Sequence, residues 1–183
     1  RLLRSGFSVG VAGGLLLSAA HGFPNDVEKI GIAQYEAGTG LGVSSGGSLW
    51  LGGAVADWLS LGVGFTGGSN RASHTRSSGG SLEVRVEAFP LYDRGIAWQD
   101  LGFLFCAGTG SYTIERDGAT VAQGQATSAI GLGVFYERWR LGHFSFGPEL
   151  EYQHQFSRSL TLQSVMIGLR TAFYAGPSPS PAR

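Results

Sequence analysis

Apolar and polar residues alternate along most of this chain, in runs of about ten residues. In the run from Leu59 to Thr66, leucine, valine and phenylalanine alternate with serine, glycine and threonine. In the run from Phe144 to Gln153, aromatic and aliphatic residues stand against serine, glycine, glutamate and glutamine. Successive side chains of a β-strand point to opposite faces. Each run therefore predicts a strand with one apolar face and one small, polar or charged face.

The chain contains eight such runs. The strands they predict cover residues 5–17, 41–55, 59–70, 79–91, 99–113, 125–137, 141–156 and 160–175. An even number of antiparallel strands with charge on one face is typical of a small membrane-spanning barrel. The predicted fold class is all-β, an eight-stranded antiparallel up-and-down transmembrane β-barrel. Residues 1–176 are expected to form it, followed by a disordered Pro/Ser tail at 177–183, because proline has no N–H to donate to a ladder.

The predicted connections differ between the two ends of the barrel. Three are short, at residues 56–58, 92–98 and 138–140. On the other side a tight connection lies at 157–159, and longer or more polar ones lie at 18–40, 71–78 and 114–124. Outer-membrane barrels have short periplasmic turns, so we expect the short turns and both termini in the periplasm. Asp117-Gly118 is a strong hairpin signal, which predicts that its flanking strands extend beyond the membrane.

The apolar stretch at residues 7–20 has two interpretations. Arg1 and Arg4 precede it and small residues follow it, as in a signal peptide. Its apolar residues nevertheless share one parity, with Phe7, Val9 and Val11 set against serine, glycine and alanine. This parity favours a first strand.

Aromatic residues gather at the predicted short turns. Trp58, Trp98 and Trp139 lie one at each of these turns. Amphipathic rings favour the membrane–water boundary, so we predict an aromatic girdle at this end; the alternative is that the tryptophans cap a soluble core. The predicted girdle consists of Trp58, Tyr92, Trp98, Tyr136, Trp139, Phe173 and Tyr174.

The inward parity collects charged residues. The predicted lumen network consists of Glu83, Arg85, Glu87, Glu137, Glu149, Glu151 and Arg170. A slip of one residue would move several of these charges into lipid, at about 2–4 kcal/mol for each Arg, so this cost sets the register. The interior of an eight-stranded barrel is filled by side chains, so the charges are expected to pair there. Five Glu against two Arg leave an excess of three negative charges.

Two residues in the predicted strands need separate treatment. Pro148 falls inside the seventh strand, where a central ladder should reject it, so we expect a bulge that changes the parity on one side. Trp50 has the inward parity of the second strand. The simplest interpretation of the lumen is a packed polar core, and the alternative is a narrow path for cations or protons.

Composition narrows the class of protein further. Only 14% of the residues are charged, against about 25% in soluble domains, which leaves little solvated surface. Basic and acidic residues balance, so no field for nucleic acid is expected. Cys106 is the only cysteine, which excludes a disulfide within the chain. The scattered histidines give no metal-ligand spacing, and neither a cofactor nor a metal is expected.

Two small motifs carry candidate chemistry. His143 and Ser145 form a His-x-Ser pair on one strand, which resembles the pair of outer-membrane lipid A deacylases; two polar lumen residues are the simpler interpretation. His74, with Arg71 and Arg76 beside it, forms a basic cluster that could bind lipopolysaccharide phosphates, and a solvated loop is the simpler interpretation.

The chain resembles the small eight-stranded outer-membrane β-barrel superfamily, which includes the membrane domain of OmpA and OmpX-like barrels. The resemblance rests on the strand count, on Trp58, Trp98 and Trp139, and on a last strand that ends at Phe173-Tyr174. It implies a location in the bacterial outer membrane. Gly176 and a Pro/Ser tail follow the last strand, which departs from members that end on an aromatic residue.

Three functions are compatible with these observations. The first is a non-enzymatic outer-membrane barrel that is closed by its Glu/Arg network and presents loops for adhesion or for a partner subunit of an envelope complex. Its surroundings would be outer-membrane lipid and lipopolysaccharide. The second is a lipid-modifying enzyme of the deacylase kind. The third is a soluble lipocalin-like barrel, which would have an apolar interior and a charged exterior.

Overall fold

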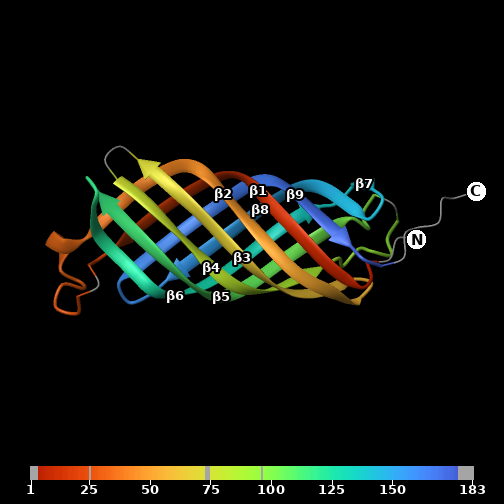
Figure 1. The fold of residues 1–183 in the computed structure, drawn as a ribbon, viewed down its shortest axis with the longest axis horizontal. Helices are drawn as coiled ribbons and strands as arrows, with labels where there is room; N and C mark the ends of the chain where they lie inside the picture. The colour runs from red at the N-terminus through yellow and green to blue at the C-terminus, as the bar shows by residue number, and fades with distance from the viewer. Residues whose placement is uncertain (1–3, 25, 73–74, 96, 177–183) are drawn as a thin grey trace, which may run out of the picture.

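The computed structural model describes residues 4–24, 26–72, 75–95 and 97–176. Its strands form one antiparallel sheet that closes on itself (Figure 1). A short 3-10 helix, η1 (Ala33–Tyr35), lies between the first two strands. No helix in the described part of the chain is long and apolar enough to cross a membrane. The strands are β1 (Phe7–Gly22), β2 (Ala37–Ala56), β3 (Leu59–Ala72), β4 (Thr75–Ala88), β5 (Leu101–Arg116), β6 (Ala119–Tyr136), β7 (Trp139–Leu141), β8 (Phe144–Phe156) and β9 (Leu160–Tyr174).

The barrel closes through β9, which pairs with both β8 and β1. Strands β1 to β5 each pair with the next strand, and β6 pairs with β8. The short β7 pairs with residues 144–146 of β8, whereas β6 pairs with residues 149–156 of the same strand. Strands β6 and β7 therefore share one position in the ring. This is the predicted all-β, eight-stranded antiparallel barrel.

Most strands run further than the hydrophobic pattern predicted. The segments 71–78 and 114–124, expected as loops, are largely strand, and Asp117-Gly118 forms a tight turn with positive φ at both residues. Residues 7–20 belong to β1, which pairs on both sides, as the strand interpretation predicted. The ladders continue because backbone N–H and C=O groups pair whether or not the side chains are apolar. The tail at 177–183 lies outside the described residues.

The expected contrast between short turns and long loops is wrong in part. The connection from β1 to β2 is the one large loop at its end of the barrel in Figure 1, and we call this the loop end. The start of β1 and the end of β9 lie at the opposite, terminal end, where Ser8 pairs with Tyr174. That end also holds the connection at residues 89–100, which was expected to be short and is not.

Pro148 produces no bulge in the ladder between β8 and β9. The register there is continuous from Phe144 to Phe156, and Pro148 pairs with Leu169. On the other side of β8, the pairings with β6 and β7 leave a gap at Gly147 and Pro148. The missing N–H therefore falls where the ladder is already interrupted, and the parity of Glu149 is unchanged.

The polarity of the barrel is inverted relative to a soluble protein. Glu83 and Arg85 are each 3% exposed, whereas the intervening Val84 is 59% exposed. Leu132 and Ile167 show the same outward placement on β6 and β9. A lipocalin-like barrel requires the reverse arrangement, so the structure excludes that interpretation.

Candidate functional site

The lumen is organised around one guanidinium group. Arg170, on β9, is 1% exposed. Its Nη2 lies 2.9 Å from Glu87 Oε1 and 2.9 Å from Glu137 Oε1, and its Nη1 lies 3.0 Å from Glu149 Oε2. These carboxylates come from β4, from the segment after β6, and from β8. Arg170 therefore links distant parts of the ring through charge-assisted contacts.

Arg85 extends this network from β4. Its Nε lies 2.8 Å from Glu87 Oε1, and its Nη2 lies 3.6 Å from Glu149 Oε1. The Trp50 ring makes cation–π contacts with both arginines. Its centre lies 4.2 Å from the guanidinium carbon of Arg85 and 4.7 Å from that of Arg170. The quadrupole of the ring attracts both, which supports two like charges in one buried space.

Glycine makes room for this tryptophan. Gly10 on β1 pairs with Trp50 on β2. A Cβ atom at position 10 would lie 2.1 Å from Cζ2 of the Trp50 ring. The indole therefore occupies the space that any larger residue at position 10 would fill.

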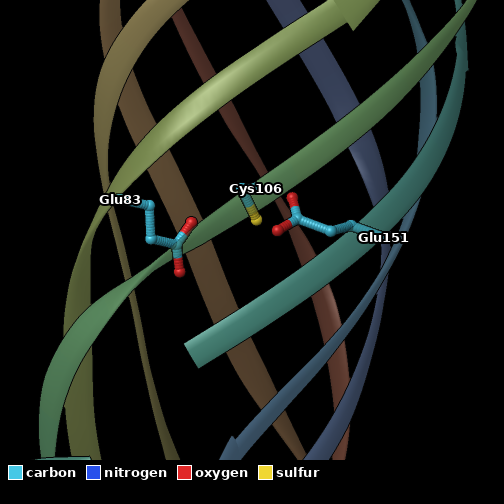
Figure 2. A group of neighbouring side chains, drawn as sticks. All are labelled: Glu83, Cys106 and Glu151. Atoms are coloured by element: carbon cyan, nitrogen blue, oxygen red, sulfur yellow. The ribbon is translucent and has the colours of Figure 1, made fainter. Parts of the chain in front are cut away.

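The structure places all seven predicted lumen residues inside the barrel but divides them into two groups. Glu83 accepts a hydrogen bond from Thr66 at 3.3 Å and further bonds from Ser81 and Gln153. Neither oxygen of Glu151 has a hydrogen-bond partner among the described residues. The ion-pair network contains Arg85, Arg170, Glu87, Glu137 and Glu149. Glu83 and Glu151 lie beside Cys106 instead (Figure 2).

A second cluster of charged residues, which the sequence pattern missed, lies inside the barrel at the terminal end. Arg4 is 4% exposed, with its Nη2 3.3 Å from Asp100 Oδ1 and its Nε 3.5 Å from Glu137 Oε2. Its guanidinium carbon lies 3.5 Å from the centre of the Phe89 ring. Arg140 also pairs with Asp100. Arg4 precedes both the predicted first strand and β1, so strand parity could not place it. Asp100 lies inside the predicted strand 99–113 and shares the parity of the buried Cys106, but it was not included in the predicted network.

Apolar side chains gather inside the barrel near the loop end. Tyr112, Ile114, Leu160 and Leu162 are buried there and pack together. The Tyr112 hydroxyl forms a 2.8 Å hydrogen bond with the hydroxyl of Ser77. From the loop end to the terminal end, the lumen therefore contains an apolar plug, Glu83 and Glu151 beside Cys106, the ion-pair network and the Arg4 cluster.

The residues of the predicted girdle differ in their exposure and contacts. Trp58, Trp98 and Trp139 are 44%, 55% and 59% exposed. The Tyr174 hydroxyl instead donates to both oxygens of the buried Glu137, at 3.1 and 2.9 Å. Tyr174 follows Phe173 directly, and neighbouring residues of a strand cannot both face lipid.

The remaining girdle members are Tyr92, Tyr136 and Phe173. Tyr92 is half-buried and packs against the buried cluster that includes Phe89 and Phe135. The Tyr136 hydroxyl donates to the carbonyl oxygen of Ala97 at 2.8 Å. Phe173 is half-buried and contacts the ring of Phe144, with 5.3 Å between the ring centres.

The two residues of the His-x-Ser pair make separate contacts. Ser145 is buried, and its hydroxyl donates to the carbonyl oxygen of Ala172 at 3.4 Å. His143 lies exposed in the turn before β8, with its Nδ1 2.9 Å from the carbonyl oxygen of Tyr174. The two side chains therefore serve different contacts.

The predicted basic cluster is described in part. His74 lies outside the described residues. Arg71 and Arg76 are exposed and face each other directly across β3 and β4, so they lie in strands and not in a loop.

The large loop at residues 23–36 has contacts of its own. Lys29 Nζ lies 2.9 Å from Asp26 Oδ2 and 5.7 Å from the centre of the Tyr35 ring. This ammonium, followed by the backbone N–H of Glu28, holds the pKa of Asp26 below its usual value. Val27, Ile32 and Tyr35 are exposed on the same loop.

No family model and no curated protein sequence matches this chain. Its fold is similar to the crystal structure of Neisserial surface protein A, with a TM-score of 0.60 and 13% identity over 93% of this chain and 97% of that one. It is also similar to Ail, the attachment invasion locus protein of Yersinia pestis, crystallised with the heparin analogue sucrose octasulfate. That match has a TM-score of 0.55 and 11% identity over 91% of this chain and 99% of that one. At these identities the likeness establishes the fold, that of the small outer-membrane β-barrels.

Proposed function

We propose that this chain is a non-enzymatic integral barrel of the bacterial outer membrane, with both termini in the periplasm. In this role it anchors itself in lipid and presents its loop end for adhesion or for a partner subunit. The observation that carries the proposal is the inverted polarity. Outward residues such as Val84, Leu132 and Ile167 are apolar and 59%, 60% and 53% exposed, while the charges face the axis. This surface suits hydrocarbon, where a charged side chain costs about 2–4 kcal/mol.

The lumen in this proposal is closed to ions. A path for cations would have to pass the apolar plug around Tyr112 and Leu160, then the three carboxylates bound by Arg170, then the guanidinium of Arg4 over Phe89. Eight strands leave an interior that side chains fill, which agrees with this packing. The purified barrel in a planar bilayer should therefore be electrically silent, and stepwise single-channel currents would contradict closure.

The surface near the loop end favours anionic groups. Arg71 and Arg76 lie directly opposite each other, and Glu115 of β5 lies opposite Arg76 on its other side, so two guanidinium groups share one neighbouring carboxylate and one positive charge is left over. Both have outward parity on their strands, beyond the outward-facing Phe65 and Leu82. Phosphate groups of lipopolysaccharide would meet them at this height. The Ail structure with sucrose octasulfate supports a polyanion as the class of ligand.

The large loop supplies a second kind of contact. Val27 is 69% exposed and Ile32 43% exposed, on a segment anchored by the Asp26–Lys29 ion pair. Exposed apolar side chains at a rim of the barrel suit adhesion or a protein partner. The proposed partner class therefore rests on two features of the loop end, a basic pair and an apolar loop.

The experiment separates anchoring from recognition. The folded barrel should fractionate with outer membranes and migrate faster on a gel before heating than after it; a soluble, heat-insensitive protein would contradict the anchor. Recognition is measured with vesicles that contain lipopolysaccharide and with a sulfated oligosaccharide. The double variant R71A/R76A should bind about tenfold more weakly, since it loses charge-assisted contacts.

The matched control for recognition is R94A/R138A, which removes two arginines at the terminal end. Arg94 and Arg138 are both exposed, so the net charge changes equally. Equal loss in the two double variants would show a general charge effect and contradict the assigned surface.

A further inference from the structure

Three potential metal ligands meet inside the barrel, apart from the ion-pair network. Glu83 on β4, Cys106 on β5 and Glu151 on β8 place one ligand atom each within 4.8 Å of the others. They are 3%, 0% and 2% exposed. Figure 2 shows the two carboxylates on either side of the Cys106 sulfur, each pointing toward it. Three strands therefore contribute to one buried cluster.

Glycines on β6 make this meeting possible. Strand β6 lies between β5 and β8, and Gly131 pairs with Cys106 on one side and with Gln153 on the other. A Cβ atom at position 131 would lie 2.5 Å from the Cys106 sulfur. Gly133, the next inward residue, pairs with Glu151. The missing side chains leave the space through which the sulfur approaches Glu151 across a whole strand.

The carboxylate of Glu151 points to a missing ligand. Both of its oxygens are buried without a hydrogen-bond partner among the described residues, and no cation of those residues lies within ion-pair distance of it. Glu83 differs, because Ser81 and Gln153 donate to it. Buried charges are paired or coordinate metals, because an isolated one is costly. The cluster therefore offers acceptors for a cation.

We propose that Glu83, Cys106 and Glu151 bind one divalent metal ion of the zinc class. Two carboxylate oxygens and a thiolate suit a borderline cation, whereas Ca²⁺ and Mg²⁺ take oxygen ligands alone. Binding releases the Cys106 thiol proton to solvent, because the thiolate is the ligand. Small rotations of the two Glu side chains bring their oxygens to zinc distances of about 2.0–2.2 Å.

The surroundings complete the site. Two carboxylates and a thiolate exceed the charge of the ion by one. Arg85 lies two residues from Glu83 on the same face of β4; its Nη2 is buried, lies 3.6 Å from Glu149 Oε1 and has no hydrogen-bond partner among the described residues, so its positive charge also acts on this excess. A cavity of about 30 Å³ adjoins Glu151 and Gln153. This space is enough for one or two waters, one of which can take the fourth position of a tetrahedral ion.

The test uses the folded full chain, stripped with a chelator and titrated with Cd²⁺ as a spectroscopic substitute for Zn²⁺. Cys106 is the only cysteine, so a thiolate-to-metal charge-transfer band in the ultraviolet reports this site alone. We expect the band to saturate at one ion per barrel and added Zn²⁺ to abolish it. The absence of a band in the folded wild type at equimolar metal would overturn the proposal.

Variants then test the two kinds of ligand. C106S should abolish the band, and E151Q, which keeps the shape of the side chain, should weaken binding about tenfold or more. The control is E36Q at the loop end, because Glu36 lies 3.6 Å from His21 and offers a surface pair for adventitious metal. Unchanged affinity in E151Q, or an equal loss in E36Q, would overturn the site. Heat-dependent gel mobility shows whether each variant is folded. If C106S does not fold, the absorption band of the wild type alone tests the proposal.

Discussion

Replacement of Arg170 by methionine tests whether the ion-pair network holds the barrel together. Arg170→Met removes the guanidinium that contacts Glu87, Glu137 and Glu149 and keeps an unbranched side chain beside Trp50. Loss of one partner from a buried pair costs about 3–5 kcal/mol, because a charge is left uncompensated. The three carboxylates do not each lose this amount, since each keeps a second guanidinium within ion-pair distance.

After the replacement, each carboxylate keeps one arginine as an ion-pair partner. Glu87 and Glu149 keep Arg85, at 2.8 and 3.6 Å, and Glu137 keeps Arg4 at 3.5 Å. We therefore expect the free energy of unfolding to fall by about 3–5 kcal/mol in total. Denaturant titration of the barrel in lipid vesicles, followed by tryptophan fluorescence and by heat-dependent gel mobility, measures this loss.

Two further variants decide whether the network is responsible. Lys29→Met also removes a cation, from an exposed pair with Asp26, and should leave the unfolding midpoint unchanged. Glu149→Gln combined with Arg170→Met should cost less than the sum of the single changes, by about 0.5–3 kcal/mol, because the two side chains are in contact. A loss below about 1 kcal/mol in Arg170→Met, the size of an exposed pair, would refute the reasoning.

Three other changes test the packing, the lipid face and the absence of catalysis. Gly10→Val should destabilise the barrel by about 1–3 kcal/mol in the same titration, because its Cβ meets the Trp50 ring, whereas Gly13→Ala has 3.7 Å to its nearest neighbour and should be tolerated. Val84→Arg should lower the free energy of unfolding in lipid vesicles by about 2–4 kcal/mol, because it places a charge on the outward face. Without lipid, it should have little effect on the yield of refolding from urea. Ser145→Ala should leave the mass spectrum of lipid A unchanged in cells, and an altered spectrum would restore the enzyme hypothesis.

The sequence determines which face each residue takes more reliably than where each strand ends. Glu83 and Val84 could be placed inside and outside because the parity is fixed and a charge in lipid is costly. The ends of β4 and β5 could not, because glycine- and serine-rich segments carry no hydrophobic pattern although their backbones still pair. The same parity rule places Tyr174 and Phe173 on opposite faces of β9, because successive residues of a strand point to opposite sides.

The sequence does not determine the depth of a side chain along the lumen. Glu83 and Glu87 lie four residues apart on β4, about 13 Å at the rise of a strand, so Arg170 contacts one and not the other. Which of the two Arg170 contacts depends on the stagger between strands that are far apart in the sequence, here β4 and β9. Strand parity alone therefore collected seven charged residues in one group where the structure has two.

This separation also explains the imbalance of five Glu against two Arg. Arg4, which lies before β1, supplies a third guanidinium and pairs with Glu137. Arg85 and Arg170 hold Glu87 and Glu149, so the uncompensated acids of the predicted network are confined to one level of the barrel. At that level Glu83 and Glu151 meet the sulfur of Cys106. Negative charges spread along the lumen could each be hydrated. Negative charges concentrated on three convergent ligands instead require a bound proton or a bound metal ion. The cadmium titration distinguishes protonation from metal binding.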